Sequence, residues 1–312
     1  MPETVLIPAA TARRFGTDVL VHGSLSQNHA QIVADALVLA DLRGVDTHGL
    51  NRLPGYLARI RSGALNPSPE LRFEQRSPVC ALLDAQHTFG FLAAHAAVER
   101  ALEMAATFGV GIVAVKNSGH YGMAATYLLQ AIEATERWRS PMLRARTTDP
   151  NRALEGVVLP IGGPKGSGLA MMMDIFGGLI TGASFAGGVH DQYKEVDQPQ
   201  GVGQWFLVFK PDLFLDSRDE YRERMDTLFS AVRSSQPAAG VDRIYTPGEI
   251  EEAERQKRER DGIPFTRAEI DALHRLAEEW GSAMRCPHSL HIPINEESNL
   301  VMSFLSFLDE DE

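Results

Sequence analysis

The stretch from residue 79 to residue 116 constrains the fold most, because it holds a strand, a long helix and a second strand in succession. Residues 79–84 form a short apolar run that predicts a strand. Residues 89–108 follow as an alanine-rich helix, and its small side chains let it pack closely on a sheet. Residues 111–116 are rich in Ile and Val and predict a buried strand. This order indicates an α/β fold.

Hydrophobic periodicity and capping residues predict the other elements; Ser26 is expected to open one helix, and Thr266 with Glu269 to form a capping box before another. Helices are expected at 8–22, 26–42, 124–135, 169–180, 221–233, 251–261 and 267–280, and a strand is expected at 204–210. Both faces of that strand are apolar, which indicates a buried position. The helix at 169–180 carries three consecutive methionines and is also expected to be buried. The helix at 251–261 is dense in charge and is interpreted as a solvated face.

Charge and cysteine content exclude several classes of protein. The 312-residue chain has a net charge of −11, which argues against nucleic acid or an anionic membrane as its partner. Two cysteines are too few for a disulfide framework or a structural zinc site. No apolar run reaches the length of a membrane span, and the first residues lack a secretion-signal pattern. A cytoplasmic enzyme is the expectation.

Residues 41–56 hold the first candidate site. Gly44 is expected to stop one helix, and Thr47 can cap the next. If that helix continues from Thr47, then His48, Arg52 and Tyr56 lie one turn apart along one face. Pro54 would kink such a helix.

These three side chains supply a proton carrier, a two-pronged guanidinium and a phenol. Reduction of a small 2-oxo or 2-imino acid needs such a set, because the carboxylate must be held and the product atom must receive a proton. A solvated helix face with a chance histidine and arginine is the alternative. On spacing alone, that alternative is slightly the better interpretation.

A second candidate, His120, comes just after the strand at 111–116. Reacting groups of α/β proteins lie at such strand ends, and Gly119 and Gly122 allow tight turns around the histidine. The alternative is a histidine that only satisfies loop carbonyls. The preceding Gly109-Val110-Gly111 stands between helix and strand, so it is a turn and not a dinucleotide fingerprint.

Residues 162–168 are rich in glycine around Lys165. This is not a Walker loop, because Gly166 stands where Ser or Thr would follow the lysine. The glycines allow close backbone approach, and Lys165 offers a charge for a phosphate, whereas the alternative is a plain helix entry. His190 next to Asp191 could suggest a metal site, but no helical ligand spacing accompanies the pair, so no metal is expected.

Four separated motifs resemble the malate/L-lactate dehydrogenase family. They are Asp41-Leu42-Arg43-Gly44 with His48-Gly49 and Arg52, Asn117-Ser118-Gly119-His120-Tyr121-Gly122, Leu159-Pro160-Ile161-Gly162-Gly163-Pro164-Lys165-Gly166, and Pro247-Gly248-Glu249. The resemblance covers roughly residues 10–280. It implies a sulfolactate-dehydrogenase-like fold with a mixed sheet, packed helices and a non-Rossmann cofactor-binding domain.

The resemblance also implies roles for individual residues. His48 and His120 would line the substrate cleft and one of them would pass the proton, while Thr47, Arg52 and Tyr56 would bind a small carboxylic acid. The residues implied to bind NAD or NADP are Pro164, Lys165, Gly166, Pro247, Gly248 and Glu249. A homodimer is implied as well; alanine-rich helices and the apolar run at 303–308 point the same way.

The chain departs from the family pattern between Gly122 and Thr147, where only 24 residues stand. Residues 1–120 with 235–312 are expected to bind substrate and form the dimer. Residues 121–234 are expected to bind cofactor, without a family segment near 137–146. Two functions therefore remain open: a dehydrogenase or reductase, and a non-catalytic binding protein that kept the substrate pocket but lost its cofactor.

Overall fold

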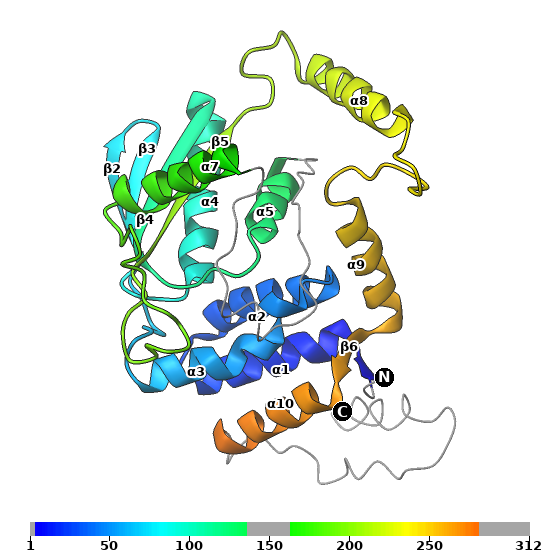
Figure 1. Cartoon of the computed structure of the whole chain (residues 1–312). Coiled ribbons are helices and arrows are strands. Elements are labelled where there is room, and N and C mark those ends of the chain that lie inside the picture. The colour runs from blue at the N-terminus through cyan, green and yellow to red at the C-terminus, as the bar shows by residue number, and fades with distance from the viewer. Residues whose placement is uncertain (1–3, 136–162, 281–312) are drawn as a thin grey trace, which may run out of the picture.

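A four-stranded sheet forms the centre of the computed structural model, which describes residues 4–135 and 163–280 (Figure 1). Its strands are β2 (Arg72–Ser77), β3 (Cys80–Asp84), β4 (Val110–Ser118) and β5 (Val202–Phe209), in that order across the sheet. β3 and β4 run parallel, whereas the two outer pairs are antiparallel. The expected α/β class and mixed sheet are confirmed.

The crossover between the parallel strands is helix α4 (Gly90–Phe108). Its alanines are buried against the sheet, and Gly111 of β4 approaches Ala101 so closely that an added Cβ would lie 2.1 Å from the Ala101 carbonyl oxygen. Gly109 ends α4 in the left-handed region with φ 86°. The turn expected at both glycines is right for Gly109 and wrong for Gly111, which belongs to the strand.

A helical layer lies beside the sheet and contains the largest cluster of buried apolar residues. It is built from α1 (Ala9–His22), α2 (Gln27–Leu42) and α3 (Leu53–Arg61). Ser26 caps α2, because its hydroxyl accepts a hydrogen bond from the backbone N–H of His29 at 3.2 Å. α2 ends where the candidate site begins, so this layer positions the site.

The two ends of the described chain meet in a second, small sheet. β1 (Thr4–Ile7) pairs antiparallel with β6 (Ile263–Thr266), and α10 (Arg267–Trp280) follows directly. Thr266 and Glu269 exchange hydrogen bonds between side chains and backbone N–H groups, which confirms the expected capping box.

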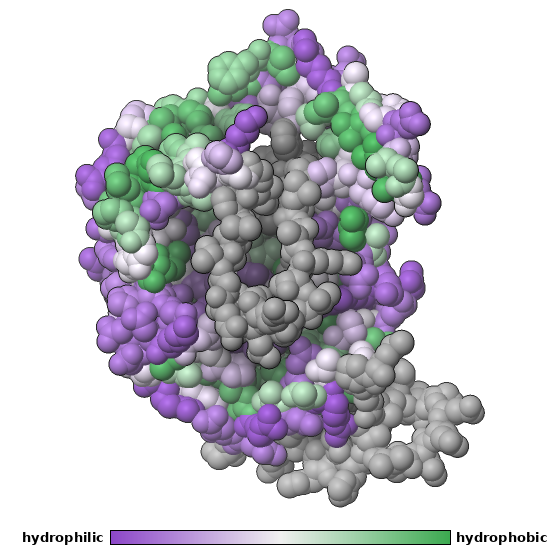
Figure 2. Space-filling view, viewed as in Figure 1, coloured by the Kyte–Doolittle hydropathy of each residue, from purple (hydrophilic) through white to green (hydrophobic). Residues whose placement is uncertain are grey.

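Helix α7 (Pro164–Asp174) and the adjoining turn η3 (Ile175–Leu179) lie on the surface, so the buried helix expected at 169–180 is wrong. Leu169, Met171 and Met173 are each more than half exposed. Figure 2 shows hydrophobic surface on the upper left of the molecule, where α7 lies in Figure 1. An apolar run predicts burial only if another element covers it, and among the described residues none covers these side chains.

Strand β5 also differs from expectation. It pairs with β4 alone and forms an edge of the described sheet. Leu207 and Phe209 are 43% and 50% exposed, so one face of the strand is open. The buried position expected from apolar residues on both faces is therefore wrong for the face that carries Leu207 and Phe209.

Three further helices complete the described chain: α5 (Ala125–Thr135), α8 (Arg218–Ser234) and α9 (Glu249–Asp261). α8 stands away from the sheet, and none of its residues is buried. α9 is not the purely solvated helix that its charge predicted, since Arg258 is only 8% exposed. Thr147–Pro150, the shortened interval near 137–146 and residues 303–308 lie outside the described residues.

Candidate active site

The segment that carries His48 and Arg52 is two short turns rather than one helix. The 3₁₀ turns Asp46–His48 and Leu50–Arg52 are separated by Gly49, which is extended with ψ −156°. Gly44, with φ 72°, ends the preceding helix as expected.

The continuous helix expected from Thr47 is therefore wrong, and so is its kink at Pro54. Pro54 lies in the first turn of α3, where a missing N–H costs little. The extended backbone of Gly49 breaks the helix, and only glycine fits there, because an added Cβ would lie 1.5 Å from a carboxylate oxygen of Asp41. The same carboxylate accepts a hydrogen bond from the N–H of Leu50 at 2.9 Å.

Burial raises the pKa of Asp41 to about 7, and the nearby Asp46 carboxylate adds to this effect. The carboxyl group is 2% exposed and lies at the end of α2, next to the loop that it holds. Asp41 thus fixes the loop that carries His48 and Arg52 without facing solvent itself.

Helix α9 holds the same loop from the other side. The guanidinium of Arg258 donates to the carbonyl oxygen of Asp41 at 2.6 Å and pairs with the carboxylates of Asp46 and Glu254. Arg43 at the end of α2 pairs with Glu252 at 3.1 Å. Buried arginines need such partners, and here they join elements more than 200 positions apart in the sequence.

Three of the predicted side chains meet on one side of this loop. The rings of His48 and His120 stack with centroids 5.5 Å apart. The hydroxyl of Tyr56 lies 2.7 Å from Nδ1 of His120, and the Tyr56 ring packs between Phe89 and Phe91. The two histidines therefore lie together, although no continuous helix face brings them there. Neither is among the described residues that line the cavity beside Arg52, so the expectation that both line the substrate cleft stays a prediction.

The contacts of His120 define its proton arrangement. Its Nδ1 accepts a hydrogen bond from the backbone N–H of Gly122 at 3.3 Å, so this nitrogen carries no proton. Burial raises the pKa of Tyr56, which keeps the phenol protonated and makes it a second donor to Nδ1. The proton of neutral His120 then resides on Nε2.

Electrostatics keep His120 neutral. Burial, followed by the positive charges of His48 and Arg52, lowers the pKa of His120 to about 4. His48 lies beside Thr47, whose hydroxyl is 2.9 Å from Nδ1 of His48. Two stacked imidazoles disfavour simultaneous protonation, which adds to the effect of burial on His120.

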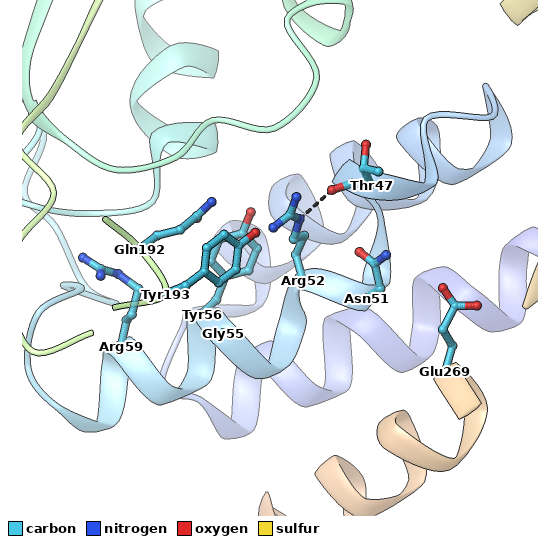
Figure 3. A pocket seen from close by; sticks show the side chains of 9 residues that line it. All are labelled: Thr47, Asn51, Arg52, Gly55, Tyr56, Arg59, Gln192, Tyr193 and Glu269. Atoms are coloured by element: carbon cyan, nitrogen blue, oxygen red, sulfur yellow. Dashed lines mark hydrogen bonds between the residues drawn. The ribbon is translucent and has the colours of Figure 1, made fainter. Parts of the chain in front are cut away.

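Arg52 is oriented by the backbone of the first turn. Its Nε donates to the carbonyl oxygen of Thr47 at 2.5 Å, and the ring of Tyr193 lies 5.3 Å from its guanidinium carbon. This geometry aims the remaining N–H groups at a cavity of about 310 Å³ (Figure 3). The described residues that line it are Thr47, Asn51, Arg52, Gly55, Tyr56, Arg59, Gln192, Tyr193 and Glu269.

Residues 190–200, here termed the wall loop, complete the cavity and were missed by the sequence analysis. Gln200 accepts a hydrogen bond from the backbone N–H of His120 at 2.8 Å, and Tyr193 covers Arg52. Arg59 of α3 donates to two carbonyl oxygens of the loop. These contacts join positions more than a hundred residues apart, or on unrelated elements, so no local pattern carries a signal for them.

In the candidate metal-binding pair of His190 and Asp191, the histidine has a carboxylate partner within the protein. His190 lies 3.0 Å from a carboxylate oxygen of Glu195 within the wall loop. Across residues 4–135 and 163–280, no cluster of three or more histidine, cysteine or acidic side chains is placed to hold a metal ion. None of the described helices has both the length and the apolar character to cross a membrane.

The start of α7 can accept an anion. Gly163 adopts φ 62°, Pro164 occupies the first turn, Lys165 is exposed and Gly166 is buried. A Cβ at Gly163 would meet no atom of the described residues within 4 Å. First-turn N–H groups together with Lys165 fit one phosphate of a dinucleotide in donor chemistry.

In the second predicted cofactor-binding segment, residues 247–249, the acidic side chain already has partners within the protein. Gly248, with φ 86°, precedes α9, and Glu249 accepts from the N–H of Thr246 at 2.8 Å. The same carboxylate pairs with Arg233 at 2.7 Å and Arg243 at 3.2 Å. A ribose hydroxyl at Glu249 would share oxygens that already have these three partners. Pro247 and Gly248 contribute only backbone groups at this helix start.

Comparison with known proteins identifies relatives along most of the chain. The malate/L-lactate dehydrogenase family model matches residues 7–135 and 144–274. L-sulfolactate dehydrogenase of Methanocaldococcus jannaschii is 29% identical, with 85% of this chain and 94% of the relative covered. Ureidoglycolate dehydrogenase (NAD⁺) of Escherichia coli is 27% identical, with 78% and 88% covered.

The fold and the matched length agree with this similarity. Malate dehydrogenase of Pyrococcus horikoshii superimposes with a TM-score of 0.80 at 26% identity, covering 90% of this chain and 97% of that one. The alignment with L-sulfolactate dehydrogenase spans 331 positions, more than the 312 residues of this chain, so the relative has positions without a counterpart here. The chain belongs to the malate/L-lactate dehydrogenase family.

Proposed function

We propose that the cavity beside Arg52 binds a small 2-oxo acid, 2-hydroxy acid or cyclic imino acid, and that the two histidines serve its reduction or oxidation. The chain is an NAD(P)-dependent oxidoreductase by family, which agrees with relatives named as NAD⁺ and NADP⁺ enzymes. The observation that carries the proposal is the contact of Tyr56, His120 and His48 next to the guanidinium of Arg52.

Arg52 holds the substrate carboxylate. Its Nε is already bound to Thr47, so the carboxylate meets the terminal N–H groups, which can grip both oxygens at once. Tyr193 on one side and the Thr47 carbonyl on the other keep the guanidinium from rotating. A fixed guanidinium orients the reacting carbon of the acid relative to the histidines.

The two histidines have different roles at the reacting atom: one donates a hydrogen bond and the other transfers the proton. Neutral His120 donates a hydrogen bond from Nε2 to the carbonyl or imine atom, because Tyr56 and Gly122 occupy Nδ1. His48 carries the proton that this atom receives on reduction and takes it back on oxidation, with Thr47 fixing its ring. The nicotinamide cofactor supplies or accepts the hydride when bound.

Residues 163–166 suit a phosphate of that cofactor, and Pro247, Gly248 and Glu249 are proposed to meet its ribose. We also propose that the family segment absent near 137–146 leaves the cofactor-binding part, residues 121–234, incomplete. The break of the family match between residues 135 and 144 supports this, as does the surplus length of the alignment with the relative.

A homodimer in the cytoplasm is the proposed working form, with residues 1–120 and 235–312 binding substrate and forming the dimer. The exposed apolar side chains of α7 and β5 add to the argument for association. The net charge of −11 disfavours nucleic acid and anionic membranes as partners.

Substitution of Arg52 tests the substrate site. Arg52→Lys should raise KM for 2-oxo acids by about 5- to 150-fold, equivalent to about 1–3 kcal/mol, because an ammonium cannot reproduce a two-pronged grip. Arg14→Lys, which alters a loose surface pair at 3.9 Å, is the matched control. Steady-state kinetics measure both, and an unchanged KM in Arg52→Lys would remove Arg52 from the site.

The non-catalytic alternative is tested on the unmodified protein. A dehydrogenase should alter the fluorescence of NADH or NADPH on mixing, whereas a binding protein that has lost its cofactor should not. Absence of any change up to millimolar protein and dinucleotide would favour the alternative.

A further inference from the structure

The turn Asp46–His48, here termed the His48 turn, orients two side chains of the proposed site at once. Its middle residue, Thr47, supplies the carbonyl oxygen that accepts from Nε of Arg52 at 2.5 Å (Figure 3). The hydroxyl of the same residue lies 2.9 Å from Nδ1 of His48. A displacement of this turn would therefore move the proposed carboxylate-binding group and the proposed proton carrier together.

The His48 turn has little rigidity of its own. It is a single 3₁₀ turn of three residues, and none of them is buried. The N–H of His48 donates to the carbonyl oxygen of Val45 at 2.8 Å, and the N–H of Gly49 donates to that of Asp46 at 3.3 Å. Hydrogen bonds of 3₁₀ geometry are poorer than those of an α-helix, so contacts from other elements have to hold this turn in place.

Arg258 of α9 makes such a contact at the first residue of the turn. Its Nη1 and Nη2 donate to the two carboxylate oxygens of Asp46, the second at 3.4 Å. Nη1 also donates to the carbonyl oxygen of Asp41, at the end of α2, at 2.6 Å. One planar group thus fixes the start of the His48 turn relative to the end of a helix whose inner face belongs to the core.

The guanidinium of Arg258 is itself held in this direction. Its Nε donates to a carboxylate oxygen of Glu254, one turn earlier on α9, at 2.7 Å. With Nε bound on the helix, the terminal nitrogens face Asp46 and the Asp41 carbonyl. A lysine at this position could not reproduce the arrangement, because an ammonium is a point charge without the fixed fork of a guanidinium.

We propose that Arg258 is a positioning residue, which holds Asp46 against the end of α2 and thereby orients Arg52 toward the substrate carboxylate and His48 toward the reacting atom. It acts through the His48 turn, since neither Arg258 nor Asp46 is among the described residues that line the cavity. This inference rests on the proposed function, because it assigns an origin to the geometry of the same site.

The pKa of His120 provides a test that needs neither substrate nor cofactor. Burial, followed by the charges of His48 and Arg52, lowers this pKa to about 4. Arg258→Lys should release the His48 turn and let both charges move away, so the pKa of His120 should rise by about half a pH unit or more. NMR titration of the histidine ring signals measures the shift, with His120→Gln used to assign them.

Kinetics provide the second test. Arg258→Lys should lower kcat/KM for a 2-oxo acid such as pyruvate or oxaloacetate by at least about tenfold, because groups out of position lose much of their effect. In an Arg52→Lys background the same substitution should cost less, since both changes weaken one interaction. A general loss of stability would instead cost the same factor in both backgrounds.

Two further variants complete the experiment. Arg260→Lys makes the same change on α9 at an exposed arginine paired with Asp261, and it should alter neither readout. Asp46→Asn replaces Arg258→Lys if circular dichroism shows that the latter is unfolded, because it removes the charge that Arg258 holds.

The outcomes separate this inference from the proposed function. An unchanged pKa of His120, or equal losses of kcat/KM in the wild-type and Arg52→Lys backgrounds, would mean that Arg258 only supports the fold, and the inference would fail alone. If wild-type protein reduces no small 2-oxo acid, the proposed function fails, and the pKa of His120 still decides whether Arg258 positions Arg52 and His48.

Discussion

The proposed substrate side, around His120 and Arg52, and the proposed cofactor side, around Lys165, differ in how firmly their residues are held. Around His120, polar groups bind one another: Tyr56, Gly122 and Gln200 all contact this one residue. Around Lys165, by contrast, the neighbouring side chains of α7 are exposed. The proposed substrate pocket is thus held by contacts among the described residues, whereas the proposed phosphate site is formed by exposed ones.

This difference indicates which of two activities, binding of the acid or binding of the dinucleotide, would weaken first if a segment were lost from the middle of the chain. The proposed substrate contacts come from α3, the end of β4 and the wall loop, each of which lies wholly inside a matched segment. The proposed cofactor contacts, residues 163–166 and 247–249, lie in the part of the chain that follows the break between residues 135 and 144. Selectivity for the acid should survive where affinity for the dinucleotide falls.

The largest expected effect tests the substrate side. His48→Gln should lower kcat by about 100- to 10,000-fold, the usual contribution of general acid–base catalysis, because glutamine cannot carry the proton. His120→Gln should lose less, since an amide still donates a hydrogen bond. His22→Gln, at the exposed end of α1, is the control.

Steady-state kinetics with a 2-oxo acid, together with circular dichroism of each variant, measure this prediction. A larger loss in His120→Gln than in His48→Gln would reverse the assigned roles. Normal turnover in both variants would show that neither histidine passes the proton. The proposed contrast between the substrate side and the cofactor side would then no longer hold.

The second prediction tests the cofactor side. If the absent segment supplied several charge-assisted contacts of about 1.5–3 kcal/mol each, this 312-residue chain should bind NADH and NADPH orders of magnitude more weakly than a chain with the segment restored. The restored chain is made by inserting the corresponding segment of L-sulfolactate dehydrogenase between residues 136 and 147.

Calorimetry on both chains decides the comparison. Micromolar affinity of the unmodified chain would show that Lys165 and its neighbours suffice, and the contrast between the two sides would disappear. Equal affinity for 2-hydroxy acids in the two chains would serve as the internal control, because the substrate side is the same in both.

The sequence predicted elements that depend on local physics. The helix at 26–42, its Ser26 cap, the alanine-rich helix and the Thr266–Glu269 capping box all follow from periodicity and nearby hydrogen-bond partners, and all are confirmed. The surface position of α7 was not predictable in this way. Its apolar composition is a local property, whereas its burial depends on which other elements pack against it.

The site was predicted through resemblance, and its geometry only in part. Spacing suggested a helix from Thr47, but the extended Gly49, next to Asp41, divides the segment into two turns. Tyr56 and His120 are 64 positions apart, so their contact results from packing between α3 and the end of β4. The wall loop had no local signal because its attachments join side chains to backbone groups far away in the sequence: Arg59 donates to two of its carbonyls, and Gln200 accepts from the N–H of His120.

The smallest expected effect concerns Asp41, the buried carboxyl group behind the substrate side. Its native pKa of about 7 lies above the ordinary value of 3.8, so the native state binds this proton more tightly than the unfolded chain. Its contribution to the free energy of unfolding is fully present below about pH 4 and is lost as pH rises to about 7. Asp46 and Glu269 strengthen this trend, and Arg258 and the N–H of Leu50 oppose it.

Asp41→Asn should remove this pH dependence while keeping an acceptor for the N–H of Leu50. The slope that disappears is at most about 1.4 kcal/mol per pH unit, because one group exchanges one proton. Urea unfolding of both proteins at several pH values between about 4 and 7 measures it, with Asp35→Asn on the exposed face of α2 as control. Parallel curves for wild type and Asp41→Asn would mean that Asp41 is ionised throughout. The loop that carries His48 and Arg52 would then be held by a permanent charge, compensated by Arg258, and not by a neutral acid.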